Sequence, residues 1–402
     1  MMGIRLRQAR LSSGMTLEML ADRLALANQA ITKAALSKYE LEKSEPNQKM
    51  LLAIANALGV RVGYFFESST TKIDWIAFRR LAKMPVKRQE QVKAYASHVV
   101  ENQISLQLLL FPEESAKFPE MQNARNFDDA ERIAHELREA WSLGDAAIDS
   151  LTAQVEDHGG VVVPSNDMGR DFDGLAGRTS EGFPVAVVSM QVPDDRRRYN
   201  LAHELGHLLM RCEELSNKEE EKLANRFASA LLVPATVVRH ELGSKRKHLD
   251  VRELAILKLK YGFSMQGWAR RALDLEIIDA GQYKALCVMF SRNHWKKIEP
   301  VKFEGNEVPT RLRLMTLRAI AEGLISKERT EQICPGCTSE NDLFESERAY
   351  SPTDLRRLPK DQRDSILKAA AEQVADVYTT DRDLTDFEAF GQEDLYVDSA
   401  ES

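Results

Sequence analysis

Residues 201–209 read Leu-Ala-His-Glu-Leu-Gly-His-Leu-Leu, and this stretch determines how the central part of the chain is interpreted. His203 and His207 are four residues apart, so on a helix they lie on one face, about one turn apart, and can reach the same ion. Two imidazoles and a carboxylate suit zinc and leave a fourth position for water or a substrate carbonyl. Glu204 lies beside His203, where a carboxylate can serve as the general base. The motif predicts a Zn2+ site with hydrolytic chemistry.

A third metal ligand is expected from the acidic residues that follow the motif. The candidates by type are Glu213, Glu214, Glu219, Glu220 and Glu221. A helix is predicted over residues 217–232, with an apolar face formed by Leu223, Ala224, Phe227 and Leu231. Glu221 lies at the edge of this face and is preferred, whereas Glu220 lies near its middle and is the alternative. Asn225, one turn after Glu221, is placed to hold a ligating imidazole.

Several stretches around the motif resemble one family of metallopeptidases. They are Trp141-Ser-Leu-Gly144, Phe172-Asp-Gly174, the segment 198–207 and the segment 221–234. Together they resemble the ImmA/IrrE family of zinc metallo-endopeptidases over roughly residues 125–300. The resemblance implies that Glu221 is the third zinc ligand and that the substrate is a regulatory protein, typically a DNA-bound repressor. The alternative is a degenerate domain that retains the motif without cleaving.

The oxyanion of a hydrolytic reaction also needs a stabilising group. Tyr199 and His240 are candidates for this role by residue type only.

The first 67 residues carry the signals of five short helices. The first helix ends near Gly14, and Thr16 is a plausible N-cap for the second, over residues 17–24. Further helices are predicted over about residues 32–41 and 48–58, the latter closing at Gly59. A short fifth helix leads to Phe65 and Phe66.

The helix predicted over residues 32–41 has the composition of a DNA-reading helix. Ala35, Leu36 and Tyr39 point inward, and the outward set is Thr32, Lys33, Ala34, Ser37 and Lys38. These side chains are short, hydroxyl-bearing or cationic, as a helix in the major groove requires. The segment 3–66, with its Ser37-Lys-Tyr-Glu40 signature, resembles the Cro/cI-type (Xre) helix-turn-helix family. The resemblance implies operator DNA as a partner, and a protein-interaction module on the same fold is the alternative.

Charge differs between the two ends of the chain. The net charge is +3 over residues 1–70 and −10 over residues 340–402. Because the net charge of the whole chain is −7, the residues between these two segments are neutral overall. A head charge of only +3 gives modest affinity for phosphates, so specific DNA binding is expected to depend on a homodimer that contacts two half-sites. The link over residues 25–30 is longer than the tight turn usual in this family, which bears on the angle between the flanking helices.

Composition excludes several classes of protein. No apolar run approaches the roughly 18 residues that span a bilayer, and four cysteines are not a disulfide framework in a chain of 402 residues. The sequence therefore predicts a cytoplasmic protein that does not contact membranes. Cys334-Pro-Gly-Cys337 is a lone C-x-x-C motif and is interpreted as an ordinary turn.

The tail over residues 351–402 is acidic with spaced aromatic residues. This pattern indicates a segment that folds against a basic partner. The tail resembles the C-terminal segments of small antitoxins. It therefore supports a second hypothesis, a non-proteolytic antitoxin that autoregulates its operon and neutralises a PIN-type ribonuclease toxin.

These signals predict a mainly α protein with a small β-sheet, of the α+β class. The expected parts are a helix-turn-helix domain (1–67), a helical connector (68–124), a zincin-like metallopeptidase domain (125–300), a helical extension (301–350) and the acidic tail (351–402). The preferred function is a transcriptional regulator that carries a zinc-dependent endopeptidase.

Overall fold

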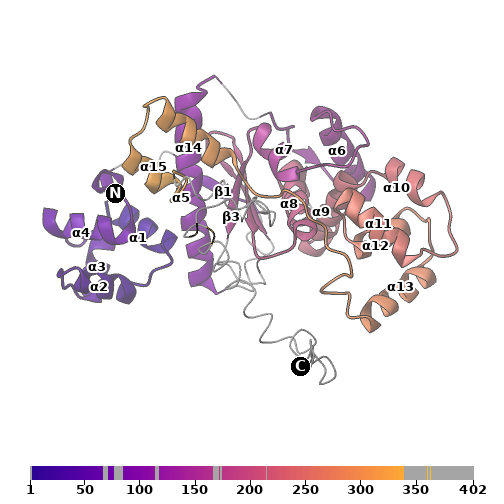
Figure 1. Cartoon of the computed structure of the whole chain (residues 1–402), viewed down its shortest axis with the longest axis horizontal. Coiled ribbons are helices and arrows are strands. Elements are labelled where there is room, and N and C mark those ends of the chain that lie inside the picture. Colours follow the sequence, from indigo (N-terminus) through magenta and orange to yellow (C-terminus); the bar gives the residue numbers. More distant parts are fainter. Residues whose placement is uncertain are drawn as a thin grey trace, which may run out of the picture. The chain divides into compact units, whose positions relative to one another are not determined.

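A computed structural model describes residues 2–66, 71–76, 85–113, 117–165, 172, 174–213 and 215–338, together with Lys360 and Arg363. Over these residues the chain is mainly helical with a small sheet, as predicted (Figure 1). No helix in this part of the chain has both the length and the apolarity needed to cross a bilayer. Apart from Lys360 and Arg363, the predicted tail lies outside the described residues.

The N-terminal domain contains the predicted helices. They are α1 (Met2–Ser12), α2 (Leu17–Leu26), α3 (Lys33–Glu40), α4 (Gln48–Leu58) and the 3-10 helix η1 (Val62–Phe66). The side chains of Thr16, Thr32 and Asn47 cap α2, α3 and α4 by accepting backbone N–H groups. Gly59 ends α4 with a φ of 68°, a left-handed conformation that favours glycine. The link between α2 and α3 spans residues 27–32.

The stretch predicted as a helical connector contains strands as well as a helix. It includes β1 (Ile73–Trp75), α5 (Val86–Leu110) and β2 (Gln122–Asn123). β1 pairs antiparallel with β4 (Gly174–Thr179), with Ile73 opposite Thr179. A strand of three residues is too short to show an alternating pattern, and distant pairing partners stabilise it. The connector is therefore not helical throughout.

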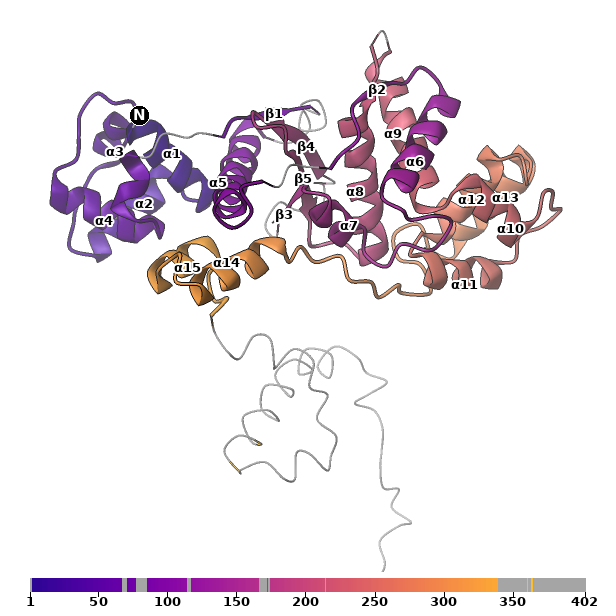
Figure 2. The same ribbon diagram turned by 90° about the horizontal axis from the view of Figure 1, so that it is seen from above.

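The principal sheet is covered by helices on both faces. Its order is β1-β4-β5-β3, with β3 (Val161–Ser165) and β5 (Pro184–Ser189) parallel and β4 antiparallel to its neighbours. Successive side chains on a strand point to opposite faces. Val161 and Val163 accordingly join the cluster that includes α5, while Val162 joins the cluster that includes α8 (Asp194–Leu209). Figure 2 shows the sheet between α5 and α8.

The rest of the described chain is almost entirely helical. Its elements besides α8 are α6 (Phe127–Ala140), α7 (Leu151–Asp157), β6 (Met210–Arg211), α9 (Asn217–Leu232), α10 (Ala235–Leu242), α11 (Val251–Tyr261), α12 (Met265–Asp274), α13 (Ala280–Arg292), α14 (Arg311–Ala321) and α15 (Lys327–Ile333). The predicted helix over residues 217–232 is α9. The two short strands β2 and β6 pair parallel with each other.

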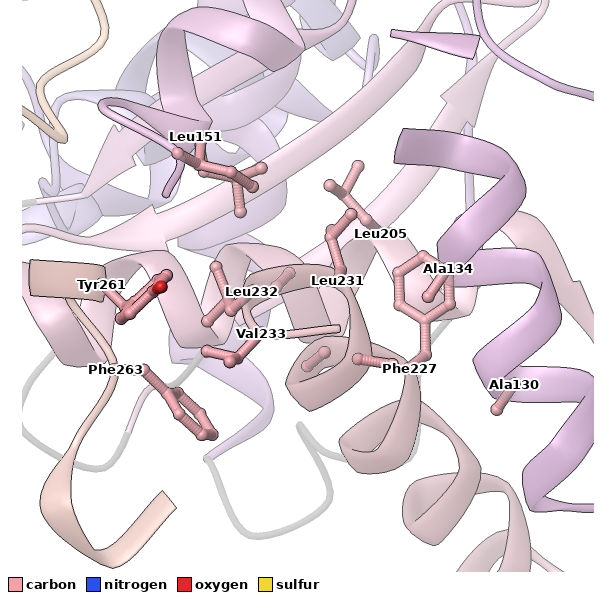
Figure 3. Packing of buried hydrophobic residues seen from close by; sticks show 14 of the residues in the cluster. Ala130, Ala134, Leu151, Leu205, Phe227, Leu231, Leu232, Val233, Tyr261 and Phe263 are labelled. Carbon is pink, nitrogen blue, oxygen red and sulfur yellow. The ribbon is translucent and has the colours of Figure 1, made fainter. Parts of the chain in front are cut away.

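The main hydrophobic core fixes α8 against α9 and α6. Figure 3 shows Phe227 of α9 directed at α6, on which Ala130 and Ala134 are labelled, with Leu205 of α8 nearby. All four side chains are buried, and burial of a phenylalanine stabilises a fold by about 1.5–3 kcal/mol. The two helices that carry the predicted metal ligands are therefore held in a fixed relation.

A buried ion pair anchors the first half of α8. Arg198 donates to Glu307 at 2.7 Å, and the two side chains are 1% and 0% exposed. Glu307 also accepts the backbone N–H groups of Leu151 and Thr152 at the start of α7. Removal of one partner would leave a buried charge without compensation, so this pair is structural.

Candidate metal centre and nucleic-acid interface

Helix α8 carries both histidines of the motif. It begins after Pro193 with Asp194 and Asp195 in its first turn, where carboxylates interact favourably with the helix dipole. His203 and His207 are buried, and their Nε2 atoms lie 3.0 Å apart. The helix therefore brings two ring nitrogens to one point.

Close packing of α9 against α8 brings a carboxylate to the same point. Gly206 permits this approach, because a Cβ atom there would lie 3.2 Å from the Phe227 ring and 3.3 Å from the Cα of Ala224. A larger side chain at this position would separate the helices. Glycine inside the motif therefore has a packing role.

Glu221 of α9 faces both histidines. Its Oε2 atom lies 3.5 Å from Nε2 of His203, and its Oε1 atom lies 3.4 Å from Nε2 of His207. A tetrahedral zinc ion with bonds of about 2.0–2.1 Å separates its ligand atoms by about 3.3 Å. The three side chains therefore fit zinc. Within the described ranges, no other set of three histidine, cysteine or acidic side chains converges in this way.

The two histidines of the centre are buried, and its carboxylate is partly exposed. The side chains of His203 and His207 are each 2% exposed, whereas Glu221 is 37% exposed. Three protein ligands leave the fourth position of a tetrahedral ion for water or substrate. This arrangement is typical of catalytic rather than structural zinc sites.

The outer ring nitrogens of both histidines face oxygen atoms. Nδ1 of His203 lies 3.0 Å from Oδ1 of Asn225, which also accepts a hydrogen bond from the Tyr199 hydroxyl at 2.9 Å. Nδ1 of His207 lies 3.3 Å from Oε1 of Glu220. These acceptors favour a proton on each Nδ1 and leave each Nε2 lone pair for a metal. Glu220, the alternative ligand considered from the sequence, therefore lies on the outer side of His207.

The carboxylates around His207 control its protonation in the absence of metal. Burial of the imidazole lowers its pKa, but hydrogen bonds to Glu220 and Glu221 and the charge of Glu204 outweigh this effect. The pKa of His207 is raised to about 9. A metal ion that binds near neutral pH must therefore displace a proton from this ring.

Glu204 lies against the sheet. Its side chain is fully buried, and a Cβ atom at Gly174 of β4 would lie 2.8 Å from its Oε1 atom. Only glycine leaves room for the carboxylate at this position. The sequence did not indicate this contact, because the two residues are 30 positions apart and lie on different elements.

The two candidates for oxyanion stabilisation have different surroundings. Tyr199 is hydrogen-bonded to Asn225 beside the metal centre. His240 on α10 has an 85% exposed side chain that faces Glu241. Only Tyr199 therefore contacts a residue of the centre.

The C-x-x-C segment forms a turn after α15. The backbone N–H of Cys337 donates to the carbonyl of Cys334 at 3.1 Å. Burial raises the pKa of the Cys334 thiol to about 12, which disfavours the thiolate that a metal requires.

Helix α3 presents its predicted outward face to solvent. Leu36 is fully buried, and the predicted DNA contacts are exposed at four positions and half-buried at Ser37; the exposed ones are Thr32, Lys33, Ala34 and Lys38. The face is therefore accessible to a ligand.

Two of these side chains already have local partners. The Thr32 hydroxyl accepts the backbone N–H of Ala35 and caps α3. Lys33 forms an ion pair with Glu18 of α2, and both side chains are more than half exposed. Exposed pairs contribute little stability, so Lys33 can exchange this carboxylate for a phosphate at small cost.

Two family models match the chain. The helix-turn-helix model matches residues 6–65, and the model of the IrrE N-terminal-like domain of peptidase M78 matches residues 155–272. The chain therefore combines an Xre-type helix-turn-helix domain with an ImmA/IrrE-like metallopeptidase domain.

Part of the chain is similar to a prophage-derived regulator. The chain is 34% identical over 74 residues to the SPbeta prophage-derived uncharacterized HTH-type transcriptional regulator YonR of Bacillus subtilis (strain 168). The match covers 18% of this chain and 64% of that regulator. No solved structure matches the chain.

Proposed function

We propose that this protein is a DNA-binding transcriptional regulator whose central domain is a zinc-dependent endopeptidase acting on a repressor or another regulatory protein. The observation that carries the proposal is the convergence of His203, His207 and Glu221 within 3.0–3.5 Å, with Glu204 adjacent. The family match to a metallopeptidase-like domain supports the same chemistry.

Each side chain has a distinct role in this proposal. His203, His207 and Glu221 hold the ion, and Asn225 orients the first of these imidazoles. Zinc, when bound, supplies a Lewis acid that polarises the scissile carbonyl. Glu204 takes a proton from the attacking water and can return it to the leaving amine. Its burial against β4 holds the carboxylate in one position.

The N-terminal domain is proposed to bring this chemistry to DNA. Its exposed α3 face offers two lysines and short side chains that suit the major groove. The similarity to a prophage-derived transcriptional regulator supports operator binding. A regulatory protein bound at the same promoter would then lie close to the peptidase.

The test compares protein N-termini in host cells that express the parent chain or the Glu204→Gln variant. The matched control is Glu139→Gln, the same change at an exposed residue of α6. We expect new N-termini of a regulatory protein with the parent and the control but not with Glu204→Gln, while all three chains retain zinc. Identical N-termini in all three would contradict proteolysis.

A further inference from the structure

Two segments of the central domain are basic and contain no acidic residue. Residues 243–249 and 280–298 together hold seven lysines and arginines, whereas the average composition of the chain would place about four acidic residues there. The whole chain has a net charge of −7. These segments are therefore an exception to its overall charge.

The structure joins the two segments. The side-chain amide of Gln282, in the first turn of α13, donates to the backbone carbonyls of Arg246 and Lys247. Gln282 also completes the capping box of α13 with Asp279. Helix α13 lies beside α12, as Figure 2 shows. The loop before α11 and the start of α13 therefore form one continuous surface.

Of the seven cations in these two segments, only Arg246 is neutralised by a carboxylate within the described residues. Arg246 pairs with Glu253 at 3.0 Å. The other six are exposed and have no carboxylate partner in the part of the chain that the structure describes; they are Lys245, Lys247, Lys284, Arg292, Lys296 and Lys297. We call these six residues and the hollow between Lys284 and Arg292 the α13 surface.

The hollow runs along one face of α13. Its volume is about 550 Å³, and its lining includes Lys284, Arg292, Gly281 and Ala285. Lys284 and Arg292 are eight residues apart, which is about 12 Å along a helix. Three to four successive phosphates of one DNA strand rise through about the same distance. Between the two cations the hollow is lined by Ala285, Val288 and Met289, so its floor is apolar and the cations at its two ends supply the charge.

We propose that the α13 surface binds the phosphate backbone of duplex DNA. Charge complementarity favours this partner, because six cations meet one negative charge per about 1.7 Å of duplex axis. The choice of DNA rests on the proposed function, since a head that binds DNA raises the local concentration of phosphates for a second site on the same chain. Phosphate contacts at this surface add affinity for DNA that does not depend on base sequence. They would add to the modest affinity of the N-terminal domain, residues 1–70, whose charge is only +3.

The test measures DNA binding by the full chain and by the Lys284→Ala/Arg292→Ala variant. Fluorescence anisotropy is recorded over a range of salt concentrations with a fragment of the protein's own promoter and with a duplex of unrelated sequence. The matched control is Lys117→Ala/Arg125→Ala, which removes two exposed cations elsewhere in the chain. Zinc content checks that all variants are folded.

We expect the double variant to bind both duplexes about tenfold more weakly at low salt. The slope of log K against log salt should decrease by about two, one for each lost phosphate contact. The control should behave as the parent. An unchanged slope and an unchanged Kd in the α13 variant would overturn the proposal. The same unchanged DNA binding is expected if the surface binds an acidic protein instead of DNA.

The two DNA proposals fail separately. If substitutions on the α3 face abolish promoter preference while the α13 variant binds as the parent, the head assignment stands and the α13 surface is wrong. If the salt slope of the α13 variant decreases by about two while the α3 variant retains promoter preference, the α13 surface stands and the head assignment is wrong.

Discussion

Helices α8 and α9 carry the proposed metal site and helix α3 carries the proposed DNA-binding face, and the two regions arrange their side chains in opposite ways. In α8 and α9 the metal-facing atoms converge within 3.0–3.5 Å from a buried floor. On α3 and its cap the side chains proposed for DNA binding are exposed or, at Ser37, half-buried, and Lys33 pairs with the exposed Glu18 of α2. A converging site depends on every member, whereas an exposed face adds independent contacts. The first should fail in one step and the second gradually.

Removal of one metal ligand gives the largest expected effect. Glu221→Ala should lower zinc affinity by more than about a hundredfold, beyond the 10- to 100-fold loss typical for groups that only orient ligands. Elemental analysis of protein purified without added metal checks this. The matched control is Glu220→Gln, which should retain zinc because Glu220 lies on the outer side of His207 and is not among the three converging ligands. Equal zinc in the parent and Glu221→Ala would move the third ligand to Glu220.

A single methyl group should separate metal binding from catalysis. Gly174→Ala places a Cβ atom where Glu204 lies, so the base should shift and peptidase activity should fall about a hundredfold. Zinc content should remain that of the parent. The control is Gly63→Ala, where the nearest atom to a new Cβ lies 3.9 Å away. Full activity in Gly174→Ala would show that this contact does not position the base.

The DNA face should respond in steps. The triple variant Lys33→Ala, Ser37→Ala, Lys38→Ala should bind promoter DNA about 10- to 100-fold more weakly, with each lysine variant alone giving part of the loss. Salt should weaken the parent steeply, and zinc content should not change. Anisotropy titrations measure these effects. Intact promoter affinity in the triple variant would place recognition on another surface.

Proton release gives the smallest but most specific signal. The raised pKa of His207, about 9, means that the ring is protonated near neutral pH in the metal-free protein. Zinc binding near pH 7 should therefore release about one proton from this ring, and the number should fall as pH rises through 9. Calorimetric titrations in buffers of different protonation enthalpy measure it. Release that does not change across this range would show that His207 binds metal from its neutral form.

The helices were predictable from the sequence to the extent that their caps are local. Thr16 and Gly59 mark helix ends because a side-chain oxygen or a left-handed glycine acts within one turn. No local pattern in the sequence marks the strands β1 and β4. β4 has glycine at two of its six positions, and it is stabilised by pairing with β1 and β5 rather than by its own pattern.

The metal ligands were more predictable from the sequence than the residues that contact and position them. The spacing of His203 and His207 follows from helix geometry, and the helix that carries Glu221 follows from its apolar face. The contacts of Glu220 with His207 and of Gly174 with Glu204 depend on how separate elements pack. No local pattern contains that information, since the partners lie 13 and 30 positions apart.

X-ray absorption at the zinc edge on the purified full chain would identify the ligands of the ion between α8 and α9. We expect one zinc ion with nitrogen and oxygen ligands at about 2.0–2.1 Å, two of them imidazoles, and no sulfur. Sulfur at about 2.3 Å would contradict it, because that result would place the metal on cysteines such as Cys334 and Cys337 rather than between α8 and α9.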